Sequence, residues 1–278
     1  MEYIELNISV ADSEQSEIVV ALLSDYPFEA FDEAEGELRA YIQTAEWSQC
    51  QKWVESMLVE QGLRFAALEV EQQNWNAEWE SSFDAVDVVG EKPIRIRAEH
   101  HPAPEEGVID VVIAPRMSFG TGHHTTTALM SATIAAEDVA GKSGLDMGCG
   151  TGVLAIVALK CGAERMVAVD IDDWACDSCR DSIALSGVEE RVDVRCGSID
   201  VVGDEKFDFI LANINRNILQ MMMMERFSAV LQSGGWIAMS GFLEEDAEAV
   251  AQSAAEQGLK RVGQQMRDGW VVMVCKKQ

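Results

Sequence analysis

A glycine-rich turn constrains the fold of this chain more than any other segment. Gly148, Gly150 and Gly152 follow the apolar strand candidate 145–146 and lead into the apolar helix candidate 152–161. Glycine adopts positive φ at no steric cost, and its missing side chain lets backbone amides approach a ligand closely. The turn therefore predicts a strand–loop–helix unit of an α/β fold that cradles a small molecule.

The spacing of these glycines distinguishes two classes of cofactor. A dinucleotide-binding loop has the pattern G-x-G-x-x-G, which would require glycine where this chain has Val153. The observed pattern begins at Asp146 and suits a nucleoside carried on an amino acid, with Asp146 near its cationic amine. Asp170 ends the next strand candidate, 18 residues after Gly152, where one carboxylate accepts both hydroxyls of a ribose. The alternative for Asp170 is a solvated loop acid.

Strands and helices alternate from residue 106 onward, which predicts a mostly parallel sheet covered on both faces. The strand candidates are 145–146, 166–170, 192–196, 207–212 and 236–240. The helix candidates between them are 152–161, 174–186 and 244–257. Asp268 and Gly269 separate two further apolar segments, and Asp-Gly at such a place indicates a hairpin. This doubly wound α/β domain is therefore expected to have an antiparallel last strand.

The first 72 residues have a different pattern and predict a separate, small α+β domain. Strand and helix candidates follow the order β-α-β-β-α-β, which is that of a ferredoxin-like domain. Residues 73–105 are expected to be a linker, in which Trp75, Trp79 and Phe83 form one face of a helix. The predicted domains are thus 1–72, 73–105 and 106–278.

Charge excludes several classes of partner. The 278 residues include 21 Lys+Arg and 48 Asp+Glu, a formal net charge of −27, so no nucleic acid or anionic membrane is expected as a direct partner. Residues 1–72 contain 3 basic and 16 acidic side chains, which predicts that this domain recognises a cationic substrate. The alternative is that the acidic residues serve only solubility.

The sequence also indicates a cytoplasmic protein without a metal site. Residues 1–5 lack the basic and apolar segments of a secretory signal, and no apolar run reaches the ~20 residues of a bilayer span. The seven cysteines form no paired framework, and the single Cys176-x-x-Cys179 motif cannot close a four-ligand zinc site. Reduced thiols are therefore expected.

Two further motifs resemble those of a known family. One is Phe-Gly-Thr-Gly-His-His-Thr-Thr-Thr at 119–127, and the other is Leu-Ala-Asn-Ile at 211–214. Together with the glycine turn, they resemble the class I S-adenosylmethionine-dependent methyltransferases and, more narrowly, the PrmA family of ribosomal protein methyltransferases. The resemblance covers essentially the whole chain. It implies a Rossmann-like sheet of seven strands and an enzyme that methylates amine nitrogens of the basic large-subunit ribosomal protein L11, on lysine side chains, the N-terminus or both.

The resemblance also implies roles for individual residues. The expected cofactor-binding residues are Thr127, Gly148, Gly150, Gly152, Asp170 and Asn213, with Phe119 and Gly120 at the lip of the pocket. The expected catalytic groups are the side-chain carbonyl of Asn213 and the main-chain carbonyl of Ile214, which would accept the hydrogens of the acceptor amine and aim its lone pair. No dedicated base is evident, so positioning is expected to supply most of the rate.

Several alternatives stay open at this level. Asn213 could instead cap the following helix. Thr125 stands where many relatives have proline, and Asn215-Arg216 stands where small apolar residues are common, both near the expected acceptor entrance. The alternative functions are a class I methyltransferase for another protein or a small molecule, and a non-catalytic module that binds S-adenosylmethionine.

Overall fold

The computed structural model describes residues 3–23, 26–34, 36–70, 84–90, 92–114, 120, 122–219 and 224–278. The predicted aromatic stripe of Trp75, Trp79 and Phe83 and the expected lip residue Phe119 lie outside the described residues. The chain divides into two compact units, Met1–Ala77 and Glu78–Gln278. Among the described helices, none is both long enough and apolar enough to cross a membrane.

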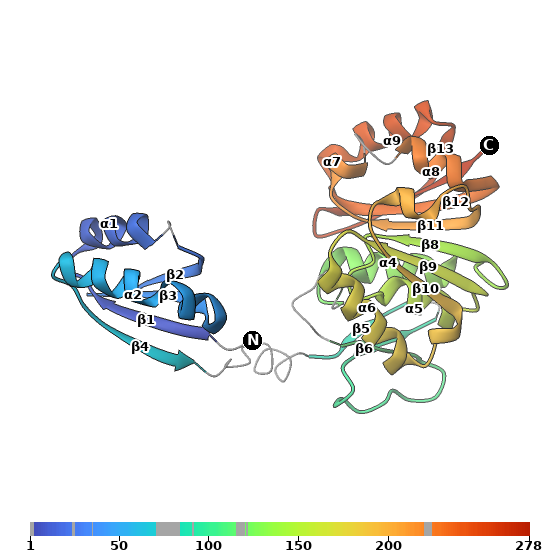
Figure 1. Ribbon diagram of the computed structural model, residues 1–278. Helices are drawn as coiled ribbons and strands as arrows, with labels where there is room; N and C mark the ends of the chain where they lie inside the picture. Colours follow the sequence, from blue (N-terminus) through green and yellow to red (C-terminus); the bar gives the residue numbers. More distant parts are fainter. Residues whose placement is uncertain are drawn as a thin grey trace. The chain divides into compact units, whose positions relative to one another are not determined.

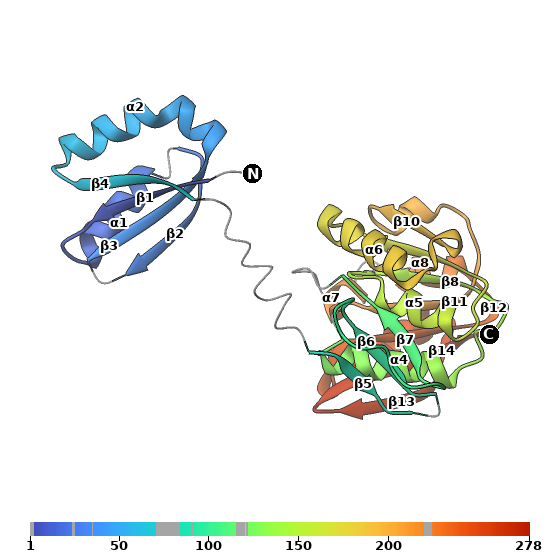
Figure 2. The same ribbon diagram turned by 90° about the horizontal axis from the view of Figure 1, so that it is seen from below.

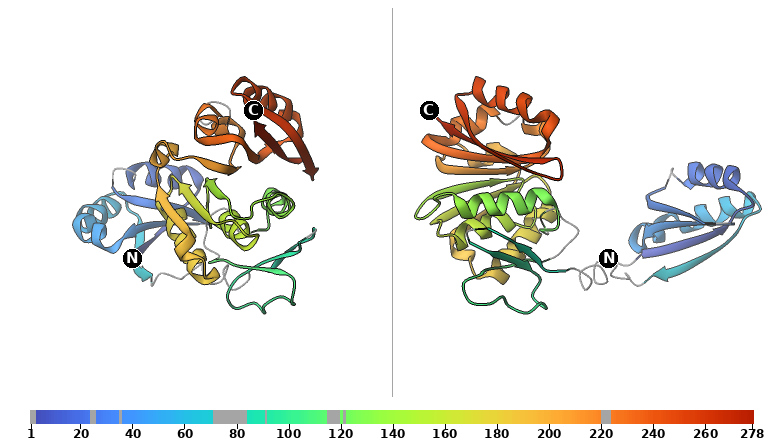
Figure 3. Two further views of the ribbon diagram at one scale, coloured as in Figure 1. Left: turned by 90° about the vertical axis from the view of Figure 1, so that its right-hand side faces the viewer. Right: turned by 180° about the vertical axis from the view of Figure 1, so that it is seen from behind.

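The first unit is a four-stranded antiparallel sheet covered by two helices. Its elements are β1 (Tyr3–Ser9), α1 (Ser13–Leu23), β2 (Phe28–Ala34), β3 (Glu37–Gln43), α2 (Thr44–Glu60) and β4 (Arg64–Val70). The strands lie in the order β2-β3-β1-β4. Alternate residues of β1, such as Leu6 and Ile8, are buried against Val54 and Leu58 of α2. Both helices lie on this one face of the sheet (Figures 1 and 3).

The second unit contains a larger mixed sheet, built from elements that alternate along the chain. After three short strands these are α4 (Thr125–Ala136), β8 (Ser143–Met147), α5 (Val153–Lys160), β9 (Arg165–Asp170), α6 (Asp173–Ser186), β10 (Val192–Cys196), β11 (Phe207–Asn213), α7 (Arg216–Ile218), α8 (Met224–Val230), β12 (Leu231–Leu243), α9 (Ala247–Glu256), β13 (Leu259–Arg267) and β14 (Trp270–Lys277). The seven strands described here follow the order β10-β9-β8-β11-β12-β14-β13 (Figure 1). β14 is antiparallel to both of its neighbours, whereas β10, β9, β8, β11 and β12 are mutually parallel.

Side-chain alternation along the central strands creates a core on each face of this sheet. In β9, Met166 and Ala168 pack into the cluster that includes α4, α5 and α6, whereas Val167 and Val169 pack into the cluster that includes α8 and α9. All four side chains are fully buried. Strands buried on both faces consist of nearly continuous apolar residues, which is why their sequence pattern was recognisable.

Residues 84–105 differ from the prediction, because they are not a linker. β5 (Val86–Val88) and β6 (Ile94–Arg97) form a small sheet with β7 (Ile109–Val112) and belong to the second unit (Figure 2). Ile94 and Ile96 are fully buried in the same core as α4 and α5. The strand β6 is only four residues long and stands among charged residues and prolines, so its Ile-Arg alternation is too short to be recognised with certainty as a strand.

The predicted hairpin at the end of the chain is confirmed. β13 and β14 pair antiparallel, from Leu259 opposite Lys277 to Arg267 opposite Trp270. Asp268 and Gly269 form the turn with φ of 53° and 78°. Positive φ at both central residues is what a two-residue hairpin turn of type I′ requires.

Candidate functional site at the carboxyl edge of the sheet

The predicted site residues end three neighbouring parallel strands. β8 lies between β9 and β11, and its Met147 is in register with Val169 and with Ala212. The residues next along the chain are Gly148, Asp170 and Asn213. In open α/β sheets, ligands bind beyond the carboxyl ends of the strands. The fold therefore brings these three residues to the edge at which such a fold binds its ligand.

The glycine turn is held in one conformation by its neighbours. Gly148, Gly150 and Gly152 have φ of 74°, 52° and 76°. The Gly148 N–H donates to the Val169 carbonyl at 2.8 Å, which ties the turn to β9. A Cβ on Gly152 would lie 2.5 Å from Cys179 Sγ, too close for any side chain. Glycine is thus required both by backbone conformation and by packing.

Asp170 binds the glycine turn with its side chain. Its Oδ2 accepts the Gly150 N–H at 3.0 Å, and its Oδ1 accepts the Asp172 N–H at 3.1 Å. A carboxylate has about four acceptor positions, so both oxygens retain capacity for a ligand hydroxyl. These bonds argue against the interpretation of Asp170 as a merely solvated acid, since they fix its carboxylate at the edge of the sheet.

Asp146 is a fully buried carboxyl group at the end of β8. Its Oδ2 accepts the N–H of Ala155 in the first turn of α5 at 3.1 Å. Burial raises the pKa of Asp146 to about 7, although the Ala155 hydrogen bond lowers it, and the Asp170 charge adds to the increase. Asp146 thus satisfies a donor at the start of α5, and it titrates near neutral pH.

Asn213 ends β11 and is 9% exposed. The helix that follows is capped by a different residue, because Asn215 Oδ1 accepts the Ile218 N–H at 3.1 Å. The alternative in which Asn213 serves as this cap is therefore wrong. Asn213 Oδ1 is buried and has no hydrogen-bond partner among the described residues.

The 119–127 motif contacts the glycine turn. The Thr151 hydroxyl, from within that turn, donates to the Gly120 carbonyl at 2.7 Å. His124 caps α4 by accepting the Thr126 N–H at 3.3 Å, and its ring packs edge-on against Trp270 with centroids 4.7 Å apart. Thr127 lies in the first turn of this helix and is 1% exposed.

Three predicted residues each have a buried side-chain oxygen without a partner in the described structure, as do some residues elsewhere, for example Asn7 and Thr44 in the first unit. The three oxygens are Thr127 Oγ1, Asp146 Oδ1 and Asn213 Oδ1. Leaving a buried polar atom unpaired costs about 1–3 kcal/mol, so such atoms are rare unless a ligand pairs with them. Their donor and acceptor chemistry fits a polar ligand with amine and hydroxyl groups.

Comparisons with known proteins decide the family. The family model described as "Ribosomal protein L11 methyltransferase (PrmA)" matches residues 5–278. The chain belongs to this family. It is 34% identical to the ribosomal protein L11 methyltransferase of Phocaeicola vulgatus, over 98% of both chains. It is 37% identical to that of Porphyromonas gingivalis, over 92% of this chain and 89% of the other.

A solved structure agrees with the PrmA assignment at the level of the fold. The ribosomal protein L11 methylase of Lactobacillus delbrueckii subsp. bulgaricus matches with a TM-score of 0.64 and 24% identity. The match covers 70% of this chain and 100% of that one. The fold is thus the α/β methyltransferase fold, and the cofactor of the PrmA family is S-adenosylmethionine.

Two departures from the PrmA pattern have structural roles. Arg216 forms an ion pair with Asp246, and Asn215 caps α7 as described above. The Thr125 hydroxyl donates to Asp268 Oδ2 at 3.2 Å, which ties the start of α4 to the turn of the last hairpin. Each of these polar side chains therefore makes a hydrogen bond or an ion pair within the fold.

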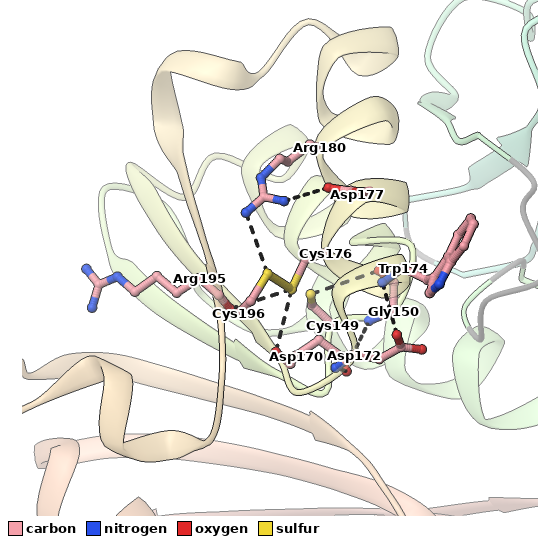
Figure 4. The surroundings of a disulfide bond; sticks show 10 residues. All are labelled: Cys149, Gly150, Asp170, Asp172, Trp174, Cys176, Asp177, Arg180, Arg195 and Cys196. Atoms are coloured by element: carbon pink, nitrogen blue, oxygen red, sulfur yellow. Dashed lines mark hydrogen bonds and ion pairs between the residues drawn. A yellow bond between two sulfur atoms is a disulfide. The ribbon is translucent and has the colours of Figure 1, made fainter. Parts of the chain in front are cut away.

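Two of the seven cysteines differ from the prediction of reduced, unpaired thiols, and the other five are free. Cys176 and Cys196 form a disulfide, with Cα atoms 6.0 Å apart (Figure 4). Cys176 Sγ also lies 3.5 Å from the carbonyl oxygen of Asp170. Cys179 lies instead against the glycine turn. Its hydrogen bond with Cys149, together with burial, raises the pKa of the Cys149 thiol well above the usual value. The CxxC motif is thus not a dithiol pair, and no group of metal-binding side chains occurs among the described residues.

Sequence reasoning missed Thr151, which joins the two loops of the candidate site. It also missed that Asp170 binds Gly150. A hollow of about 700 Å³ between α9 and β13 contains none of the predicted residues. Its walls include the exposed ion pair of Glu248 and Arg261 rather than unpaired buried groups. The candidate site is therefore the carboxyl edge of the sheet, where the unpaired oxygens of Asp146 and Asn213 are.

Proposed function

We propose that this protein transfers methyl groups from S-adenosylmethionine to amine nitrogens of ribosomal protein L11, on lysine side chains, the N-terminal amine or both. Membership of the PrmA family supports the reaction and its substrate. The observation that carries the proposal to particular residues is the buried, unpaired Asn213 Oδ1 at the end of β11. It is an acceptor held at the edge where we propose that the ligand binds.

The cofactor-binding residues that we propose are Thr127, Gly148, Gly150, Gly152, Asp170 and Asn213, with Phe119 and Gly120 at the lip. The Asp170 carboxylate would accept the ribose hydroxyls, since its free acceptor positions lie beside the glycine turn. When bound, S-adenosylmethionine supplies an electrophilic methyl group. The unpaired oxygens of Thr127 and Asn213 support this assignment, because a polar ligand would satisfy them.

The acceptor amine must be neutral to react. Deprotonating a lysine with a pKa of ~10.4 at pH 7 costs about 4–5 kcal/mol, whereas an N-terminal amine near ~7.8 costs about 1 kcal/mol. Asn213 and the Ile214 carbonyl would accept the remaining hydrogens of the amine and thereby aim its lone pair. Desolvation favours the neutral amine, and water would take up the proton. Positioning thus supplies the acceleration.

The first unit is proposed as the ferredoxin-like domain that recognises the substrate. Its strand order and its two helices on one face support that fold. The 16 acidic and 3 basic side chains of residues 1–72 support recognition of a basic protein. A ribosomal protein as substrate also supports a cytoplasmic location.

The test is an intact-mass measurement of purified ribosomal protein L11 after incubation with the enzyme and S-adenosylmethionine. We expect mass increases in steps of one methyl group, and loss of those steps in the Asn213→Ala variant. The matched control is Asn215→Ala, which removes the neighbouring cap instead. Labelled methyl groups on other proteins of a cell extract but not on L11 would disprove the substrate, and bound cofactor without any transfer would indicate a non-catalytic module.

A further inference from the structure

Ile214, the proposed acceptor-side residue, packs against two glycines, one in the turn after β8 and one in β12. A Cβ on Gly148, after β8, would overlap Ile214 Cγ2. A Cβ on Gly241, in β12, would overlap the Ile214 carbonyl oxygen and would lie 2.7 Å from its carbonyl carbon and 3.2 Å from its nitrogen. The main chain of Ile214 therefore packs directly on the backbone of Gly241, with no room for a side chain there.

Gly241 is the extra residue of a β-bulge. In the pairing of β12 with β14, Ser240 is opposite Val272 and Phe242 is opposite Val271, so the register shifts across Gly241. Gly241 has φ of 93°, in the region that favours glycine. Bulges bend a strand locally and are common next to active sites, where they redirect the groups beside them.

Ser240 connects this bulge to the proposed site. Its side chain is fully buried, and its Oγ donates to the Val271 carbonyl at 2.7 Å. On the other side, Ser240 is in register with Asn213 of β11. One hydrogen bond therefore holds the bulge in place at the level of the sheet where Asn213 ends its strand.

We infer that Gly241 is a positioning residue for methyl transfer, which sets the place of the Ile214 main chain and, with it, of Asn213. This inference rests on the proposed function, because it acts through those two groups. Any side chain at position 241 must displace the Ile214 main chain, since the overlap is with backbone atoms. A small misplacement at a reacting centre lowers the rate steeply. Asn213 is also a proposed cofactor-binding residue, but the bond between Asp170 and Gly150 lies on other elements and should persist, so we expect cofactor binding to change less than the rate.

The test compares Gly241→Ala with Gly234→Ala in methyl transfer to ribosomal protein L11. Gly234 is a matched control, because it lies in the same strand, has φ of 78° and has open space within 4 Å of the point where a Cβ would stand. We expect Gly241→Ala to lower kcat by about tenfold or more, with a smaller change in the cofactor Kd, and Gly234→Ala to leave kcat unchanged. A folded Gly241→Ala variant with the kcat of Gly234→Ala would overturn the inference.

Two further variants separate this inference from the proposed function. Ser240→Ala adds no atoms and should also lower kcat, by about threefold or more, because one hydrogen bond that holds the bulge is lost. If Gly241→Ala does not fold, an unchanged kcat in Ser240→Ala overturns the inference. In an Asn213→Ala background, Gly241→Ala should lower kcat by a smaller factor than in the wild type, because only its effect through the Ile214 carbonyl remains. An equal factor in both backgrounds would contradict the part of the inference that concerns Asn213. If Asn213→Ala alone keeps normal turnover, the proposed catalytic site fails, and this inference with it.

Discussion

The backbone N–H of Gly150 donates to Asp170 Oδ2 at 3.0 Å, which joins the glycine turn after β8 to the end of β9. The two residues are 20 positions apart in the sequence, yet they act as one unit at the edge of the sheet. A carboxylate that binds the turn and also receives ribose hydroxyls would couple the shape of the turn to cofactor binding. This relationship makes the role of Asp170 testable.

Replacing Asp170 by Asn should weaken S-adenosylmethionine binding by about 10- to 100-fold, because a hydrogen bond to a charged group contributes about 1.5–3 kcal/mol. Calorimetric titration of the cofactor measures the change. The matched control is Asp172→Asn, two residues further on, where the side chain caps α6 by accepting the Trp174 N–H at 3.0 Å. Equal cofactor affinity in the two variants would contradict the assignment of Asp170.

Replacing Asn213 by Ala should lower kcat by about 100-fold, since the acceptor amine would lose the group that positions it. The free energy of unfolding without cofactor should stay the same or rise slightly, because a buried oxygen without a partner is removed. Asn215→Ala should show the reverse pattern: loss of about 1 kcal/mol of stability with the loss of a helix cap, and normal turnover. Steady-state kinetics and thermal unfolding of both variants give the comparison.

Asp146 should make stability depend on pH. Its folded pKa of about 7 exceeds the ordinary value of 3.8, so the folded state binds more protons than the unfolded state between those pH values. Protonated Asp146 therefore stabilises the folded state fully below about pH 4. This stabilisation, about 4 kcal/mol, is lost as pH rises from about 4 through 7.

Asp146→Asn isolates that effect, because the amide of the variant does not titrate. As pH rises, the free energy of unfolding of the wild type should therefore fall relative to that of the variant. Asp138→Asn is an informative contrast. The Lys142 ammonium lowers the pKa of the exposed Asp138, so its contribution is present above the ordinary pKa and is lost as pH falls. A pH-independent difference between wild type and Asp146→Asn in urea unfolding would refute the buried, protonated state of Asp146.

Neutralising exposed acids of the first unit should raise the KM for ribosomal protein L11. A suitable variant changes Asp12, Asp32, Glu60 and Glu69 to their amides. We expect KM to rise about threefold to tenfold at low salt, and the difference to shrink at high salt, where charge attraction is screened. The same number of changes in the second unit, at Glu105, Glu106, Glu189 and Glu190, is the control. Equal KM values would show that the first unit does not recognise its substrate by charge.

The sequence by itself determined the features whose signal is local. The glycine turn, the apolar central strands and the Asp-Gly hairpin each lie within a few residues, because backbone conformation and burial on both faces are properties of adjacent positions. Asp146, Gly148 and Asp170 could be singled out for the same reason, since each stands at the end of a recognisable strand, whereas Asn213 was assigned through the resemblance to the PrmA family.

Only the tertiary structure decided which groups meet. The bond between Thr151 and Gly120, the contact between Gly241 and Ile214 and the pairing of Cys176 with Cys196 join positions 20 to 31 residues apart. The short strand β6 likewise became visible only through its burial beside α4 and α5. Such contacts depend on how whole elements pack, and packing selects among many partners that local sequence leaves equivalent. Sequence therefore located the edge where the candidate site lies, and packing determined which atoms there have hydrogen-bond partners and which do not.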